Sequence, residues 1–360
     1  MRRDMIEIDA DWQQRTWDPQ LCLHDVEAIR LLLSGGSVVD WQRLQFSNLD
    51  QVNNYLAIQC LDMENQAHRD RLRYVFNEAV SYLEEHLKLH FPRELRAPAD
   101  VREVFLWASA PGGFRRTQIL SCVILKLMHV IHHLAAADLR HRTSVSEAEL
   151  LAMAHHRILS SARQMQIDGV PILSFAGNRK SRSSIITKLI SKRDNLAATV
   201  FDKLRYRCVV DTHEHLPAAL AWMSGHMFPF NYILPGQSHN NLLDPDSLTE
   251  LLCPEERGRI QDLAQPPTIA PDAKNEFSGA SYRIINFIAD YPVPLPEERH
   301  PFDIERGHTV FINVEIQVLD EETARNNELG ENAHHFYKQR QEQVVSQRLK
   351  RGRQPRKIKP

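Results

Sequence analysis

The segment TVFINVEIQVL, residues 309–319, constrains the fold more than any other part of the chain, because its side chains alternate with a period of two. In a β-strand such alternation separates two faces. One face carries only β-branched aliphatic residues, which are Val310, Ile312, Val314, Ile316 and Val318. A face of this kind packs in a hydrophobic core, so the segment predicts a sheet with a buried side.

The opposite face of this strand carries Phe311, Asn313, Glu315, Gln317 and Leu319. Glu315 therefore projects from the middle of a packed strand towards solvent, a basic partner or a metal ion, since burying a carboxylate without compensation is costly. An exposed or edge position is common for glutamate. The alternation alone does not choose among these environments.

Two further segments, RYRCVVD at 205–211 and SYRIINFIADYPV at 281–293, are rich in β-branched and aromatic residues and predict strands. The first half of the chain instead shows apolar residues at helical spacing. The sequence therefore predicts an α+β protein. We expect an all-α domain of unknown role at 1–165 and a mixed-sheet domain at 166–345.

Two segments interrupt this regular pattern. Residues 234–279 are rich in proline and polar residues and predict an excursion that is partly loop. Residues 346–360, SQRLKRGRQPRKIKP, form a strongly basic tail that we expect to remain unpacked. Such a tail is either a solvated segment or a contact for a polyanion, of which RNA or tRNA is the most plausible.

Bulk properties favour a cytoplasmic protein. The 360 residues suit two domains at roughly 150 residues each. The five cysteines are scattered and form no CxxC pair, which favours a reducing compartment. The first residues, MRRDMIEIDADWQQR, carry charges where a signal peptide has an apolar stretch, and the longest apolar runs are short for a membrane span. We therefore expect no membrane partner.

Two segments are candidates for phosphate binding. In GNRKSRSSIITKLISKR, 177–193, a helix would place Lys180, Ser184 and Lys188 on one stripe, which suits a polyphosphate or is simply a solvated basic face. Asp202 precedes a strand that carries Arg205 and Arg207 on one face. This aspartate could hold Mg²⁺ beside a phosphate, although aspartate before a strand is also common in turns.

A histidine group lies in LKLMHVIHHLAAAD, where His129 and His133 are four residues apart and His132 lies between them. Two imidazoles at this spacing occur in helical zinc sites. No glutamate lies between them to act as a base. We interpret all three as ordinary side chains of an amphipathic helix.

Taken in chain order, these features resemble the motifs of the RelA/SpoT alarmone synthetases. The lysine–serine stripe is followed by Asp202 and its arginine strand, by a Tyr-Arg pair at 282–283, and by VEIQ at 314–317 with ELGENAHHFYK at 328–338. The resemblance spans about residues 168–338. It implies a nucleotidyltransferase-like mixed sheet that uses Mg²⁺ to transfer the β,γ-pyrophosphate of ATP to the 3′-OH of a guanosine nucleotide, GDP or GTP.

The resemblance also implies roles for individual residues. Asp202 and Glu315 would bind Mg²⁺, and Glu315 would also activate the attacking hydroxyl. The donor phosphates would be held by Arg179, Lys180, Ser184, Lys188 and Arg207. The acceptor side would consist of Tyr282, which stacks on guanine, with Arg283, Gln317, His334 and Lys338. Carboxylates, cations and an aromatic platform suit this reaction, which requires positioning and charge neutralisation more than covalent work.

The chain departs from the family pattern at four positions. Asn178 replaces an arginine of the donor loop, Asn286 and Leu319 replace a histidine and an arginine on the acceptor side, and Phe336 replaces a lysine. Two alternatives therefore stay open. One is toxin-type pyrophosphorylation of the 3′ end of tRNA, which the basic tail suits. The other is a non-catalytic nucleotide sensor or interaction protein on a degenerate synthetase fold.

Overall fold

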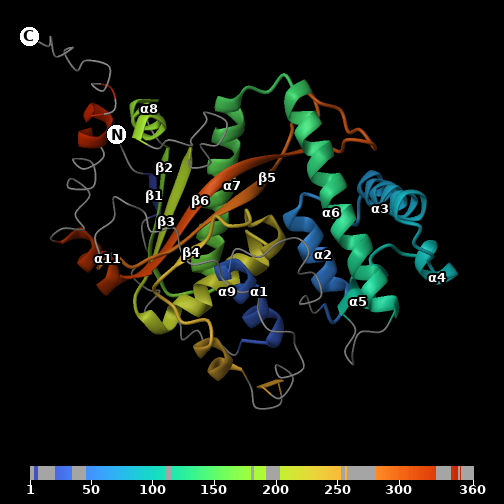
Figure 1. The fold of residues 1–360 in the computed structure, drawn as a ribbon, viewed down its shortest axis with the longest axis horizontal. Coiled ribbons are helices and arrows are strands. Elements are labelled where there is room, and N and C mark those ends of the chain that lie inside the picture. Colours follow the sequence, from blue (N-terminus) through green and yellow to red (C-terminus); the bar gives the residue numbers. More distant parts are fainter. Residues whose placement is uncertain are drawn as a thin grey trace, which may run out of the picture.

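In a computed structural model of the chain, the structure describes residues 4–6, 21–34, 46–109, 116–179, 182–191, 203–252, 256–257, 281–329, 342–347 and 349. Figure 1 shows that these residues form a mixed β-sheet with helices around it and a group of helices at one end. The predicted α+β class, with a helical region before a mixed sheet, is confirmed.

The sheet has six strands in the order β1 (Asp4–Ile6), β2 (Ile172–Arg179), β3 (Leu204–Val210), β6 (Thr309–Asp320), β5 (Ile285–Pro294) and β4 (His239–Asn240). Neighbouring strands are antiparallel except for β3 and β6, which run parallel at the centre. The strand predicted from the alternation at 309–319 is confirmed as β6.

One face of the sheet is the core face. Its β6 residues Val310, Ile312, Val314, Ile316 and Val318 are all buried, as the alternation predicts. Three helices pack with this face in a single hydrophobic cluster, α1 (Leu23–Ser34), α7 (Glu147–Ile167) and α9 (Leu216–His226). The start of α7 is fixed by a capping box, in which Ser146 and Glu149 satisfy each other's backbone N–H groups.

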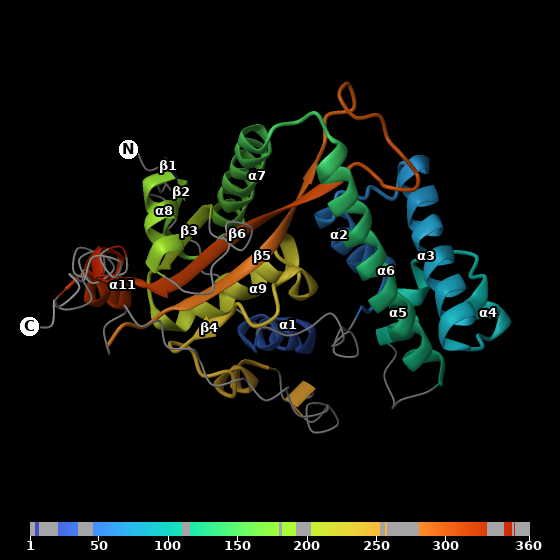
Figure 2. The ribbon, with the colours of Figure 1, turned by 45° about the horizontal axis from the view of Figure 1, so that its top comes forward.

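A second cluster holds together the helical unit, which we define as α2 (Leu49–Ile58), α3 (Gln66–Leu87), α4 (Arg93–Arg96), α5 (Glu103–Ser109) and α6 (Arg116–Arg142). Figure 2 shows this unit at the far end of the long strands β5 and β6. The boundary predicted at 165 stays a prediction. Buried side chains before this boundary, such as Ile29 of α1 and Ile158 of α7, belong to the core of the sheet.

The remaining elements are short. They are α8 (Arg182–Ser191), the 3₁₀-helices η4 (His213–His215), η5 (Phe230–Tyr232) and η6 (Ser247–Leu251), and α11 (Glu321–Glu328), which follows β6 directly. Part of the predicted excursion at 234–279 and most of the predicted tail at 346–360 lie outside the described residues. The described part of the excursion contains β4 and η6.

Helix α6 is long and apolar enough to cross a membrane, as judged by its length and composition among the described residues. The core helix of a folded domain can have the same length and composition. In this chain Leu120, Ile124, Leu125 and Met128 of α6 are buried in the cluster of the helical unit. The expectation of no membrane partner stays a prediction.

The loop between β5 and β6 docks on the helical unit, as both views show. Arg71 of α3 donates to the carbonyl oxygen of Ile304 at 2.8 Å, and the His308 ring stacks on His68 with 4.9 Å between ring centroids. Burial, followed by the charges of His68, His300 and Arg71, lowers the pKa of His308 from 6.5 to about 4. His308 is therefore neutral in the folded protein at neutral pH.

This docking predicts a loss of stability in acid. The pKa of His308 is lower in the folded state than in the unfolded state, so its contribution is fully present above pH 6.5 and is lost as the pH falls towards 4. From pH 8 to pH 5 we expect His308 to account for a loss of about 2 kcal/mol in the free energy of unfolding. In His308→Gln, the free energy of unfolding measured with urea should fall between pH 8 and pH 5 by about 2 kcal/mol less than in the wild-type protein. An unchanged difference would contradict this assignment.

Candidate functional site

The face of the central strands opposite the core carries a continuous chain of polar contacts. The parallel register places Arg205 beside Glu315 and Arg207 beside Gln317. Arg205 Nε donates to Glu315 Oε2 at 2.8 Å, and Gln317 Nε2 donates to Glu315 Oε1 at 3.2 Å. Arg207 donates through Nε and Nη2 to Gln317 Oε1, at 3.4 and 3.3 Å. We call these four residues the polar row.

Burial makes the polar row energetically demanding. Glu315 is 5% exposed and Gln317 is also buried, in the middle of the longest strand. A buried carboxylate requires a cation and hydrogen-bond donors, and Arg205, with a side chain 33% exposed, supplies both. The remaining contact of Arg207 is weak, since its Nη1 atom lies 3.9 Å from the exposed Glu328. Among the described residues, Arg207 therefore has a weaker contact with a carboxylate than Arg205 has.

Tyr282 precedes β5 and interacts electrostatically with the polar row. Burial raises the pKa of its phenol, the charges of Arg207 and Arg205 lower it, and the charge of Glu315 raises it. The phenol thus lies within the electrostatic reach of three members of the row. An aromatic ring beside two guanidinium groups can stack on a planar ligand whose phosphates the arginines bind.

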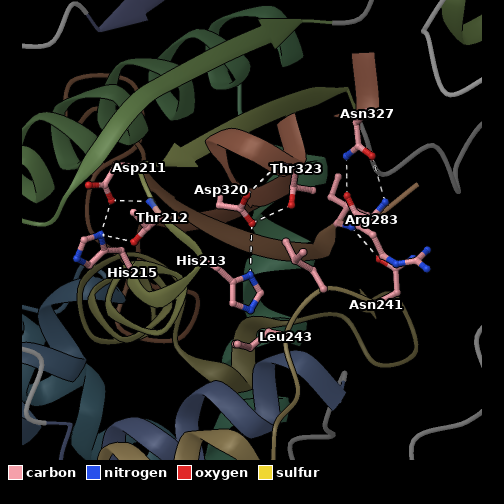
Figure 3. Close-up of polar contacts among 12 residues, drawn as sticks. Asp211, Thr212, His213, His215, Asn241, Leu243, Arg283, Asp320, Thr323 and Asn327 are labelled. Carbon is pink, nitrogen blue, oxygen red and sulfur yellow. Dashed lines mark hydrogen bonds and ion pairs between the residues drawn. The ribbon is translucent and has the colours of Figure 1, made fainter. Parts of the chain in front are cut away.

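Two asparagines hold the backbone that carries Tyr282, as Figure 3 shows for the contacts of Asn241, Arg283 and Asn327. Asn327 of α11 accepts from the Arg283 N–H at 3.1 Å and donates to the Arg283 carbonyl oxygen at 2.6 Å. Asn241, after β4, donates to the Tyr282 carbonyl oxygen at 2.8 Å and accepts from the Ile284 N–H at 2.7 Å. Each side-chain amide thus satisfies backbone N–H and carbonyl groups that a neighbouring strand would otherwise satisfy.

The buried amide of Asn327 predicts a stability effect. Asn327→Ala removes two hydrogen bonds and leaves backbone groups of Arg283 without these partners, so we expect a loss of about 1–3 kcal/mol in the free energy of unfolding. Asn326→Ala, at an exposed position of the same helix, is the matched control and should cost less than about 0.5 kcal/mol. Chemical denaturation measures both. Equal stability of the two variants would contradict the role of Asn327.

The carboxyl ends of the two parallel strands meet a second group of polar side chains (Figure 3). Asp320 caps α11 by accepting from the Thr323 N–H at 2.7 Å, and its other oxygen lies 3.4 Å from His213 Nδ1. Asp211 contacts His215 and accepts from the Thr212 N–H. Both carboxylates thus have hydrogen-bond partners close to them in the chain or in the fold. Among the described residues, no group of three or more His, Cys, Asp or Glu side chains is arranged to hold a metal ion.

The structure brings together some of the residues predicted for the site. Arg207, Tyr282, Glu315 and Gln317 share one region, and Arg283 is adjacent in the chain to Tyr282. Arg179 is not part of it, because the register pairs Arg179 with Leu204 on the core face, whereas Asn178 pairs with Arg205. Ser184 lies in α8. The remaining predictions lie outside the described residues or side chains, at Lys180, Lys188, Asp202, His334 and Lys338.

Two of the departures from the family pattern lie on the same face as the polar row. Asn286 pairs in register with Gln317 and with His239 of β4. Its Oδ1 atom is buried and has no hydrogen-bond partner among the described residues. Leu319 is buried, and its aliphatic side chain places no charge at that position. Phe336 lies outside the described residues.

Sequence reasoning missed Asn241 and Asn327, because an asparagine after a short strand or within a surface helix carries no distinctive pattern. Their role depends on contacts between residues more than 40 positions apart. Arg205 was not assigned a role in the site, although a signal was present: the alternation in RYRCVVD places it on the same face as Arg207.

No family model matches the sequence, and no curated protein matches it. Among solved structures, the small alarmone synthetase 2 from Bacillus subtilis is 15% identical, covering 57% of this chain and 94% of its own, with a TM-score of 0.31. The small alarmone synthetase 1 from Bacillus subtilis bound to its product pppGpp is 14% identical, covering 62% and 92%, with a TM-score of 0.26. Scores this low lend no weight to a function, which has to be argued from the site itself.

Proposed function

We propose that the protein is a Mg²⁺-dependent pyrophosphokinase that transfers the β,γ-pyrophosphate of ATP to the 3′-OH of a guanosine nucleotide. The observation that carries the proposal is the polar row: two arginines of β3 aligned with Glu315 and Gln317 of the parallel strand β6, with Tyr282 within their electrostatic reach. The order of these residues in the chain also matches the resemblance to the RelA/SpoT synthetases.

The donor phosphates are assigned to Arg207, and the stripe of Lys180, Ser184 and Lys188 is expected to complete their binding. Arg207 has a planar guanidinium group, and its contacts to neutral Gln317 and to exposed Glu328 are long. A polyphosphate can compete with such contacts, because an arginine–phosphate pair is bidentate and charge-assisted. Binding of this kind positions the phosphate chain above the centre of the sheet.

The fit to Mg²⁺ rests on Glu315. Its two carboxylate oxygens accept hydrogen bonds from Arg205 and Gln317, and carboxylate oxygens are ligands that Mg²⁺ prefers. Mg²⁺ commonly binds one or two protein carboxylates together with substrate phosphates and water. Asp202, the second predicted ligand, lies outside the described residues. The bound ion would neutralise charge on the donor phosphates.

Glu315 is also assigned the role of general base towards the acceptor 3′-OH. Arg205 and Gln317 fix its carboxylate from two sides, so it presents one orientation to the attacking hydroxyl. Tyr282 is assigned to stacking on the guanine base; Asn241 holds its carbonyl oxygen, and Asn327 holds the backbone of the adjacent Arg283. The protein thus aligns the two substrates and carries out little covalent chemistry of its own.

A second candidate function is nucleotide binding without transfer. It is favoured by the ion pair of Glu315 with Arg205, which engages the proposed base, and by Leu319 and Asn286 in place of two family acceptor residues. A sensor of this kind needs the arginines and Tyr282 but not a free carboxylate. The two functions therefore predict the same ligand and differ in whether product forms.

The decisive experiment is incubation of the purified chain with γ-labelled ATP and Mg²⁺, with GDP, GTP, ATP or bulk tRNA offered separately as acceptors. Label on GDP or GTP is the expected result. Label on tRNA would move the assignment to the toxin reaction. If ATP binds but no acceptor is labelled, the pyrophosphokinase proposal fails and the sensor is the remaining function.

A further inference from the structure

A buried cation lies in the helical unit, away from the polar row. Arg71 of α3 is 1% exposed, and its Nη1 atom donates to the carbonyl oxygens of Ile304, at 2.8 Å, and Glu305. Its Nε and Nη2 atoms are buried without a hydrogen-bond partner among the residues that the structure describes. Unpaired N–H groups on a buried charge are costly, so this guanidinium calls for a further acceptor.

A carboxylate does not fill this role within the described ranges. Asp303, whose charge raises the pKa of Arg71, is itself paired with Arg306 at 2.7 Å. Arg71 also lies over the ring of Tyr74, with 5.7 Å from Cζ to the ring centroid, which contributes a modest cation–π attraction. Burial lowers the pKa of the guanidinium to about 10, so Arg71 remains charged at neutral pH. Its charge is only partly compensated.

Arg71 lines a cavity of about 40 Å³ between the helices of the helical unit. Most of the wall is apolar and comes from Leu56, Leu61, Leu72, Val75, Phe105, Leu125 and Met128. The polar lining consists of Arg71 with Tyr55, Gln59, His129 and His132, and includes no carboxylate among the described residues. Since a water molecule needs roughly 10–15 Å³ by this measure, the space suits a few waters or one small ion and excludes a nucleotide.

His132 of α6 supplies a second group without a partner. Its Nε2 atom is buried and has no hydrogen-bond partner in the described part of the chain. Burial, followed by the charges of His133, Arg71 and His308, lowers the pKa of His132 well below its ordinary value, so the ring is neutral. A neutral imidazole carries a proton on one nitrogen and can donate it to an anion without adding a second charge.

We propose that this cavity binds one small monovalent anion, of the size of chloride or formate, held by the N–H groups of Arg71 and His132. The apolar wall disfavours sulfate and phosphate, because the cost of removing an ion from water rises with its charge. Since the same guanidinium holds the carbonyl oxygens of Ile304 and Glu305, the anion stabilises the docking of the β5–β6 loop on α3.

The test is thermal unfolding of the full chain in sodium chloride or sodium gluconate at equal sodium concentration, with gluconate as an anion too large for the cavity. The midpoint of the wild-type protein should rise with chloride, saturate, and reach an increase on the order of 2 °C. Arg71→Met should lose this increase. Arg73→Met is the matched control: Arg73 lies on the same helix and also donates to carbonyl oxygens, of Pro98 and Ala99, but it does not line the cavity.

Bromide provides a direct readout. Crystals of the wild-type protein grown with bromide should show an anomalous peak beside Arg71. An equal response to chloride in wild type and Arg71→Met would overturn the proposal, as would the absence of bromide from the cavity. If Arg71→Met does not fold, the bromide experiment on the wild-type protein decides alone.

Discussion

Replacing Glu315 by glutamine is expected to lower the transfer of label from γ-labelled ATP by orders of magnitude and to weaken ATP binding far less. Glutamine keeps the shape of the side chain and its contact with Gln317, but it can neither accept the proton of the acceptor hydroxyl nor bind a metal ion as a carboxylate. Loss of a general base lowers the rate by about 10²–10⁴-fold. Single-turnover transfer to GDP measures this effect, and equilibrium titration with a non-hydrolysable ATP analogue measures binding.

The matched control is Glu322→Gln, at an exposed position of α11, which should transfer label at the wild-type rate. Transfer by Glu315→Gln at a rate within threefold of wild type would show that the carboxylate in the polar row is not the base. The unfolding midpoint of the same sample shows whether a variant that has lost transfer is still folded.

The second large effect concerns the ion pair between Arg205 and Glu315. Arg205→Met removes the cation at 2.8 Å and leaves a carboxylate that is 5% exposed with the neutral Gln317 as its remaining partner in the polar row. Because Arg205 itself is one-third exposed, solvent reduces the penalty below that of a fully buried pair. We expect a loss of about 2 kcal/mol in the free energy of unfolding.

The double variant Arg205→Met/Glu315→Gln distinguishes this cause from a loss of packing. Glutamine at position 315 carries no charge, so the loss of the Arg205 cation no longer leaves a buried carboxylate without a counter-ion. The double variant should therefore be more stable than Arg205→Met alone by about 1 kcal/mol. Urea denaturation of the four proteins completes the cycle. Additive effects of the two substitutions would mean that the ion pair is energetically unimportant.

The sequence predicts the central strand well, because its alternation is a local property. The aliphatic face of Val310, Ile312, Val314, Ile316 and Val318 is buried, and Glu315 projects from the opposite face, as the period of two requires. The pattern could not show that β6 lies parallel to β3, since pairing partners 110 residues apart leave no local signal. The cation next to Glu315 therefore became identifiable as Arg205 only once the register was known.

The helices illustrate the same limit. Apolar spacing in the first half of the chain indicates helices, and residues 147–167 form one of them, α7, with one buried face. Such a pattern shows that a face is covered but not which element covers it, and α7 packs on the sheet rather than in the cluster of the helical unit. The positions of Asn241 and Asn327 depend in the same way on contacts that only the folded chain creates.

The central claim is that the polar row is the phosphate-binding part of a nucleotide site. The most direct test is calorimetric titration of a non-hydrolysable ATP analogue with Mg²⁺ into the wild-type protein and into Arg207→Met, with Arg325→Met on the exposed surface of α11 as control. We predict an affinity about tenfold weaker for Arg207→Met, because one charge-assisted hydrogen bond to the phosphates is lost. The affinity of the control should not change. Equal affinity of the wild-type protein and Arg207→Met would contradict the account.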